Sequence, residues 1–211
     1  MIILVAGTNG WNPRATQKAW CDPGSDFARF LEAEGFSVAF GAAADGSPRP
    51  FVWSTDVGGV GFGDGDLKVW HAAGLNLYSY IIPPLYPRER IAPADTKIIA
   101  HSHGLQVVLF ACAAGLKVDT LLSLGSPIRE DMQATTSAAR PNIRRWVHVH
   151  SDGSDWWQWL GALFDGNVGI VRAAARADEN IAIPKVGHTD LLNKPEHQDI
   201  WRARLLPALR G

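Results

Sequence analysis

Strand-like and helix-like patterns of apolar residues alternate along the chain. Short runs typical of buried strands are separated by segments whose apolar residues recur at helical spacing. Because the connections are mostly short, this order predicts an α/β fold, in which a mostly parallel sheet of about six strands is flanked by helices. The expected strands are residues 2–6, 36–40, 97–101, 118–124, 143–150 and 180–183, and the expected helices follow Ser25, cover residues 67–78, follow Ser102 and cover residues 195–206.

Capping and breaking residues set the expected ends of these helices. Ser25 is a typical N-cap for the first helix, and Gly35 a typical residue at its end. Pro83 and Pro84 are expected to stop the helix over residues 67–78. Residues 41–65 are rich in Gly, Pro and Ser, and a stretch of this length predicts a functional loop.

Composition limits the classes of protein that the chain can represent. Its 211 residues fit one domain over residues 1–211, and a net charge of -1 without any basic run argues against a nucleic-acid partner. No signal peptide and no segment of membrane-spanning length is visible, so we expect a cytoplasmic protein without integral membrane association. Cys21 and Cys112 are the two cysteines, and neither is expected in a disulfide.

The most informative motif is Ala-His-Ser-His-Gly at residues 100–104. A strand-like run ends at Ala100, and an apolar helical segment begins at once after Ser102. This is the pattern of a nucleophile elbow, a sharp strand-to-helix turn that exposes a serine hydroxyl at the edge of the sheet. The residues two before and two after the serine must be small, because strand and helix nearly touch there; Ala100 and Gly104 meet that condition.

A nucleophilic serine needs a base, and the base needs an acid to orient it. His188 lies between the last expected strand and the final helix, where the order Ser, acid, His places the base. The acid is expected after the strand over residues 143–150, where Asp152 and Asp155 both occur. We favour Asp155, because Asp152-Gly153 is typical of a turn. Asp190 could cap the final helix or tie down the His188 loop.

Two backbone N–H groups must also stabilise the oxyanion that forms during attack. One is expected from His103, which follows the nucleophile. The other is expected from the loop after the first strand, with Thr8 as the donor and Asn9 as the alternative. This loop lacks the third glycine of a dinucleotide-binding turn, so a nucleotide cofactor is not expected.

These residues resemble the α/β-hydrolase family, in particular its compact lipases and esterases. The resemblance rests on Gly7-Thr8, residues 100–104, Asp155-Trp-Trp and residues 187–190, and it covers essentially the whole chain. Ala100 replaces the usual first glycine, and the two leading strands of a full-length hydrolase are missing. The resemblance implies a cofactor-free serine hydrolase without a large cap domain, which cleaves a small-molecule or lipid carboxylic ester through an acyl-enzyme.

Three other functions remain to be weighed. His101 with His103, and His148 with His150, have the spacing of metal-ligand pairs. The first two flank a nucleophile on a turn and would not converge, and the second two are expected to pack beside the sheet, so no metal is expected. An acyltransferase would use the same catalytic residues. A binding protein could keep the fold without the chemistry, although it would not need all of these residues. The sequence leaves the acyl chain, the alcohol and the oligomeric state open.

Tryptophan content bears on the substrate. The chain has nine tryptophans, and Trp11, Trp53 and Trp157 fall in expected loops near the active-site edge. We expect these three to line an apolar groove for the acyl group.

Overall fold

A parallel five-stranded sheet lies at the centre of the described part of the chain. The computed structural model describes residues 1–7, 20–42, 45–51, 53, 64–85, 95–151 and 173–211. Within these residues the strand order is β1-β4-β5-β6-β7, and every neighbouring pair is parallel. The strands are β1 (Ile2–Val5), β4 (Lys97–His101), β5 (Val118–Leu124), β6 (Ile143–Ser151) and β7 (Glu179–Ile183).

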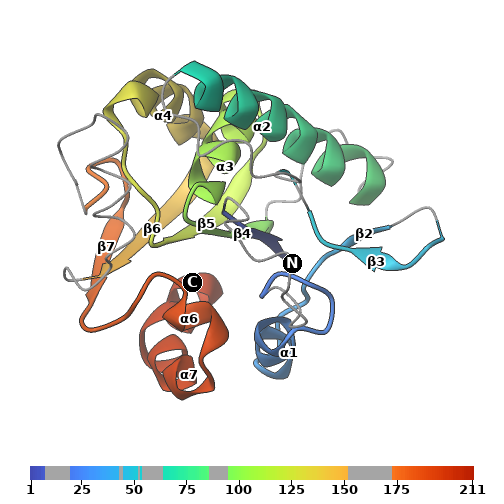
Figure 1. Cartoon of the computed structure of the whole chain (residues 1–211), viewed down its shortest axis with the longest axis vertical. Helices are drawn as coiled ribbons and strands as arrows, with labels where there is room; N and C mark the ends of the chain where they lie inside the picture. Colours follow the sequence, from blue (N-terminus) through green and yellow to red (C-terminus); the bar gives the residue numbers. More distant parts are fainter. Residues whose placement is uncertain (8–19, 43–44, 52, 54–63, 86–94, 152–172) are drawn as a thin grey trace.

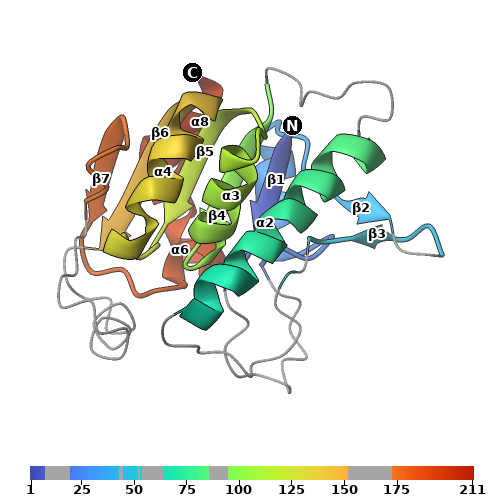
Figure 2. The same ribbon diagram turned by 90° about the horizontal axis from the view of Figure 1, so that it is seen from above.

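Helices cover both faces of the sheet (Figures 1 and 2). On one face lie α2 (Asp64–Leu85), α3 (Gly104–Ala113) and α4 (Gln133–Ala139). On the other face lie α1 (Asp26–Ala33), α6 (Asp190–Asn193), α7 (Gln198–Ile200) and α8 (Leu206–Arg210). This is the predicted α/β class of fold.

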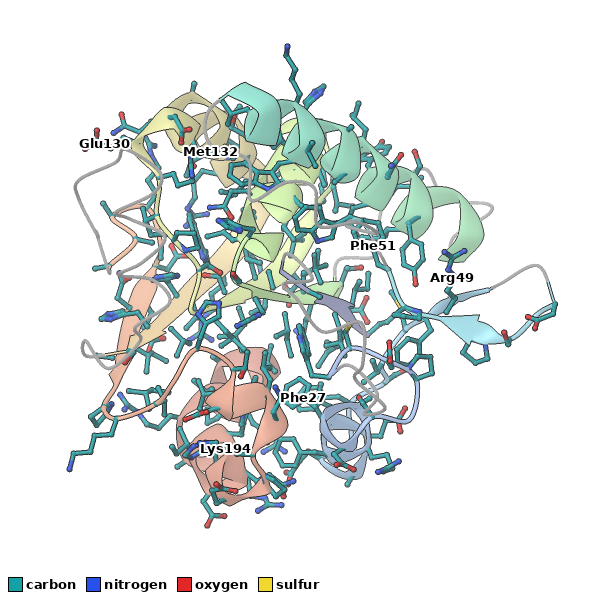
Figure 3. All side chains as sticks on the ribbon, in the orientation of Figure 1. Phe27, Arg49, Phe51, Glu130, Met132 and Lys194 are labelled. Carbon is teal, nitrogen blue, oxygen red and sulfur yellow. The ribbon has the colours of Figure 1, made fainter. Side chains whose placement is uncertain are left out.

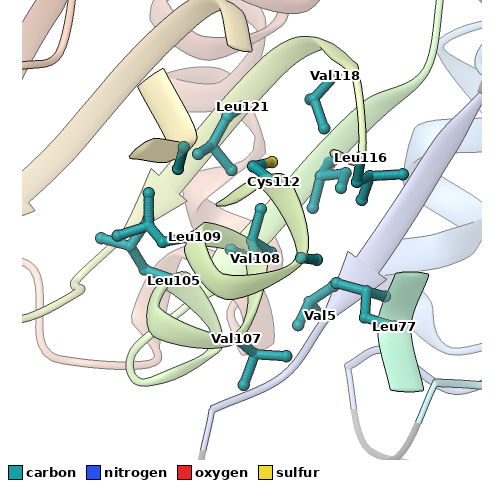
Figure 4. Packing of buried hydrophobic residues seen from close by; sticks show 14 of the residues in the cluster. Val5, Leu77, Leu105, Val107, Val108, Leu109, Cys112, Leu116, Val118 and Leu121 are labelled. Atoms are coloured by element: carbon teal, nitrogen blue, oxygen red, sulfur yellow. The ribbon is translucent and has the colours of Figure 1, made fainter. Parts of the chain in front are cut away.

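The two helical layers bury two separate apolar clusters, because successive residues of a strand point to opposite faces. In β1, Ile3 and Val5 pack under α2 and α3, whereas Ile2 and Leu4 pack against the layer of α1 and α8. Most of α3 is buried, as its apolar sequence predicts. Figure 4 shows side chains of α3 packed among those of β1, α2, β5 and the connection before β5: Val5, Leu77, Leu105, Val107, Val108, Leu109, Cys112, Leu116, Val118 and Leu121.

The prediction of a sixth strand at residues 36–40 is wrong. This segment makes one isolated bridge to the edge of the sheet, between Val38 and Ile2. The Ile2 N–H donates to the Ser37 carbonyl, and the Ile2 carbonyl accepts from the Ala39 N–H. Its side chains are half-buried or exposed, so few apolar contacts hold it along β1. The chain instead leaves toward β2 (Gly41–Ala42), where the Gly41 N–H donates to the Tyr80 hydroxyl on α2.

Helix ends follow the local signals in part. Ser25 caps α1 as predicted, since its hydroxyl accepts a 3.1 Å hydrogen bond from the Ala28 N–H, and Gly35 follows the helix with φ 87°. Helix α2 runs through Pro83 and Pro84 to Leu85, slightly beyond the expected stop. Cys21 and Cys112 are buried free thiols.

The continuous helix expected over residues 195–206 is divided into short segments. A 3-10 turn and α7 lead into a π-helix at Trp201–Leu205, which is followed by α8. Pro207 lies in the first turn of α8. Because proline has no N–H to donate to the fourth residue before it, the regular hydrogen-bond pattern is interrupted at this point.

Part of the long Gly-rich segment forms a small ribbon beside the sheet. β2 pairs antiparallel with β3 (Pro48–Arg49), and the Tyr80 hydroxyl donates to the Arg49 carbonyl at 2.9 Å. Phe51 then turns inward beneath α2 (Figure 3), where it is 5% exposed and forms a parallel bridge with Val5. This ribbon is followed by Phe51 and Trp53, which both contact the end of β1.

The start of α3 lies in direct backbone contact with the end of β1. A Cβ on Gly104 would meet the carbonyl oxygen of Val5 at 2.6 Å and that of Ala6 at 2.7 Å. Both distances are shorter than real Cβ contacts, so only glycine fits at this position without a shift of backbone.

We predict that Gly104→Ala destabilises the protein by about 2 kcal/mol or more, because neither β1 nor α3 can move away cheaply. Gly35→Ala is the control: Gly35 has φ 87°, which is unfavourable for alanine, but nothing lies within 4 Å of the added methyl. We expect it to cost about 1 kcal/mol. Urea unfolding of both variants measures the difference, and equal losses would contradict the proposed backbone clash.

Candidate active site

Ser102 lies on a sharp turn between β4 and α3. β4 ends at His101, α3 begins at Gly104, and Ser102 has φ 52°, a conformation that residues other than glycine rarely adopt. The Ser102 N–H donates a 3.0 Å hydrogen bond to the carbonyl of Leu124, the last residue of β5. The predicted strand-to-helix turn is therefore present, and it lies at the carboxyl edge of the parallel sheet.

The segment after β1 passes directly over this serine. A Cβ on Gly7 would lie 2.6 Å from the Ser102 Cβ and 3.1 Å from its Oγ. Glycine is therefore required at position 7 if the two backbones are to approach this closely. Thr8 and Asn9, the two candidate oxyanion donors that follow Gly7, lie outside the described residues.

His188 approaches the same edge from the loop between β7 and α6. Its Nδ1 lies 3.4 Å from the position that a Cβ on Gly125 would occupy. Gly125 follows Leu124, to which the Ser102 N–H is bonded, so Ser102 and His188 both contact the carboxyl end of β5. The structure thus brings the candidate nucleophile and the candidate base to one place.

His101 connects the strand that carries Ser102 with the loop that carries His188. Its buried ring lies 4.6 Å from the His188 ring, between centroids, and its Nε2 lies 2.9 Å from the His188 carbonyl oxygen. Because a carbonyl can only accept, His101 Nε2 carries the proton in this contact. The Trp20 ring also packs against the His101 imidazole in a T-shaped arrangement, with 6.1 Å between the ring centroids. His101 therefore fixes the backbone of His188.

Asp190 holds the His188 loop from its other end. Its carboxylate accepts a 2.9 Å hydrogen bond from the Gly187 N–H and forms a 3.0 Å ion pair with Lys194. Burial opposes ionisation, but the Gly187 N–H and the Lys194 charge outweigh it and lower the pKa of Asp190. Of the two roles considered for this residue, the observed contacts match tying down the His188 loop.

His103 is held as a neutral imidazole beside the nucleophile. Its ring stacks on Trp70 at 5.1 Å, and the Arg129 guanidinium lies 5.0 Å from the same indole. Burial, together with the positive charge of Arg129 and the proximity of His188, lowers the pKa of His103 to about 4. The side chain of His103 therefore stays uncharged at neutral pH. His103 is the N-cap of α3 and directly follows Ser102 in the chain.

In the second histidine pair, His148 is buried in the core and His150 is half-buried. His148 Nδ1 lies 2.8 Å from the Ser123 hydroxyl, and the Trp146 indole N–H donates to the same hydroxyl at 2.9 Å. His150 stacks beside His148. Within the described part of the chain, no group of three or more His, Cys, Asp or Glu side chains could hold a metal ion.

A small cavity of about 10 Å³ separates His188 from the end of β6, and it has room for about one water molecule. His150 and Ser151, the last residues of β6, line it together with Gly125 and His188. Asp152 and Asp155 follow this strand end but lie outside the described residues. The end of β6, which both candidates for the acid follow in the sequence, therefore faces His188.

The tryptophans of the predicted acyl groove can be placed only in part. Trp11 and Trp157 lie outside the described residues. Trp53 is half-buried, and its indole N–H donates a 2.7 Å hydrogen bond to the carbonyl of Ala6. Its polar edge thus faces the end of β1.

Sequence reasoning missed several residues of this site. Gly125, with φ 54°, gives the His188 ring room against the end of β5. The available signal was a glycine directly after a strand, in Gly125-Ser-Pro. Trp70 and Arg129 surround His103 from distant parts of the chain, and no local pattern connects them.

Two solved structures are similar to the whole described fold. A predicted CIB-like hydrolase from Thermoplasma acidophilum is 14% identical, with a TM-score of 0.51, over 100% of this chain and 86% of its own. Esterase PE8 is 14% identical, with a TM-score of 0.52, over 98% and 91%. No protein-family model matches the sequence, and the search of curated proteins found no relative. The chain has the α/β-hydrolase fold.

The helices of the described residues do not meet the requirements of a membrane span. None of them is both long enough and apolar enough to cross a bilayer.

We predict that His101→Leu lowers turnover by about tenfold, because the His188 carbonyl loses its donor and the imidazole is no longer fixed. His101→Gln places an N–H close to the position of Nε2 and should recover most of the activity. Ser25→Ala is the control for lost stability, since it removes the α1 cap on the same face of the sheet. Steady-state kinetics of the three variants measure the effect. Equal activity of the Leu and Gln variants would contradict this role.

His103 should also make stability depend on pH. The pKa of His103 is about 4 in the folded protein, whereas that of an unperturbed histidine in the unfolded chain is 6.5. Between these values the unfolded chain binds a proton that the folded protein does not, so stability falls as pH drops from about 6.5 toward 4. Urea unfolding at neutral pH and near pH 4.5 should show wild type losing about 2 kcal/mol more than His103→Phe. Parallel losses would contradict a neutral buried His103.

Proposed function

We propose that the protein is a serine hydrolase that cleaves carboxylic esters through an acyl-enzyme on Ser102. One observation carries the proposal, the arrangement around Ser102. This serine has φ 52° at the carboxyl edge of the sheet, Gly7 packs on it, and Ser102 and His188 both contact the end of β5. A structural serine has no need of a strained backbone in such a position. The fold shared with a predicted hydrolase and an esterase is consistent with it.

In the proposed reaction, Ser102 Oγ attacks the ester carbonyl while His188 takes the hydroxyl proton. The carbonyl π electrons move to oxygen, and the oxyanion accepts hydrogen bonds from the N–H groups of His103 and Thr8. When the tetrahedral intermediate collapses, the bond to the alcohol oxygen breaks and His188 returns the proton to that oxygen. Water then repeats the sequence on the acyl-enzyme, which releases the acid and restores Ser102.

Asp155 is the proposed acid. The strand that precedes it, β6, ends opposite His188, and an acid several residues beyond that end has enough chain to reach the imidazole. The carboxylate would hold the tautomer of His188 and stabilise its imidazolium form. Asp152 directly follows β6 and is the alternative.

The substrate class is a small-molecule or lipid ester with an apolar acyl group. Trp11 and Trp157 lie in segments that adjoin the ends of β1 and β6, and indole side chains there would provide an apolar wall beside Ser102. No cofactor is required by this mechanism.

We predict that Ser102→Ala and His188→Ala each lower kcat by about 10³-fold or more against activated short-chain esters. Asp155→Asn should cost about 10²-fold or more, and Asp152→Asn much less. Because the two aspartates lie three residues apart on the same segment, each serves as the matched control for the other. The reverse order would assign the acid to Asp152, and full activity of Ser102→Ala would overturn the proposed function.

A further inference from the structure

We propose that Trp53 is a positioning residue that holds the oxyanion segment over Ser102, instead of forming part of the acyl groove. The inference rests on the proposed function, because it assigns a role within the same site. Its first observation is the hydrogen bond from the Trp53 indole N–H to the Ala6 carbonyl, 2.7 Å long. The single polar atom of this side chain is thus engaged by the backbone at the end of β1.

The carbonyl that Trp53 binds belongs to the peptide group joining Ala6 to Gly7. On one side, this carbonyl oxygen lies against the start of α3, where a Cβ on Gly104 would meet it at 2.7 Å. Gly7 itself is packed on Ser102. Trp53 supplies the contact that α3 cannot, a directional hydrogen bond that fixes the orientation of this peptide group.

Trp53 is itself held in place by the segment that precedes it. Phe51, two residues earlier, pairs with Val5 in a parallel bridge and packs on the Tyr80 ring at 5.3 Å. The Tyr80 hydroxyl in turn bonds to the carbonyl of Arg49. The indole of Trp53 packs against the apolar cluster beneath α2 and α3. Its N–H therefore projects from a segment anchored to both β1 and α2.

The orientation of the peptide group between Ala6 and Gly7 determines where the next N–H groups of the segment point. These are the groups that must face the oxyanion, and displacement of a donor by about 1 Å can cost up to about 10²-fold in rate. Loss of the Trp53 hydrogen bond should therefore weaken stabilisation of the transition state while leaving ground-state binding of the ester unchanged. A residue of the acyl groove would behave differently, because its loss alters the preference for acyl chain length.

The test compares wild type with Trp53→Phe and with a variant carrying 3-benzothienylalanine at position 53. The second variant keeps the bicyclic shape of indole and replaces only its N–H by sulfur, so it separates the hydrogen bond from packing. Trp146→Phe is the matched control, since it also removes a tryptophan N–H bond from the same apolar cluster. Kinetics are measured on a series of activated esters with linear acyl chains of increasing length.

We expect kcat to fall by about tenfold in both position-53 variants, by the same factor for every ester, with KM within about twofold of wild type. Trp146→Phe should keep its kcat. Thermal melting identifies variants that fail to fold, and the benzothienyl variant decides the case if Trp53→Phe does so. A changed preference for acyl length, or an unchanged kcat in the benzothienyl variant, overturns the inference alone. Wild type without any ester hydrolysis overturns the proposed function as well.

Discussion

The close approach of β1, β4 and α3 around Ser102 is the constraint on which the rest of the site depends. The serine can hold φ 52° because its N–H is bonded to the end of β5 and because α3 begins at once on Gly104. At Gly7 and at Gly104 the neighbouring atoms lie so close that a methyl group would not fit. Strain at one residue is therefore maintained by packing of the whole sheet and its most buried helix.

Neighbouring elements then position each further group with respect to that turn. His101 binds the carbonyl of His188, and Asp190 binds the N–H of Gly187, so the loop between β7 and α6 is held at both ends of the histidine. On the opposite side, Trp53 binds the carbonyl of Ala6. These contacts go to the backbone, so they fix the position of the site without using the side chains proposed for chemistry.

Electrostatics around the serine favour one charge-bearing imidazole. His103 is kept neutral by burial and by Arg129, so it adds no second positive charge in the proposed reaction, in which His188 takes up a proton. The segregation of roles among the three histidines follows from their contacts. His101 donates to a backbone carbonyl, His103 stacks on Trp70, and His188 lies against Gly125 at the edge of the sheet.

Much of the fold could be predicted from sequence, because buried parallel strands and an apolar helix leave strong local patterns. The turn at Ser102, the Ser25 cap and the strand over residues 118–124 are cases in which local chemistry and tertiary packing agree. The prediction of a strand at residues 36–40 is wrong, because this segment pairs with β1 at one residue alone. The contacts of Trp53 and Arg129 join distant segments, and no periodicity encodes them. Asp155 and Thr8 lie outside the described residues, so their roles stay predictions from sequence.

The central claim is that Ser102 is a nucleophile activated by His188. The most direct measurement is intact-protein mass spectrometry after reaction with a fluorophosphonate, followed by peptide mapping, for wild type and for His188→Ala. The account predicts one adduct, on Ser102 of the wild type, that forms far more slowly in the variant. An adduct elsewhere, no adduct at all, or equal rates in the two proteins would contradict it.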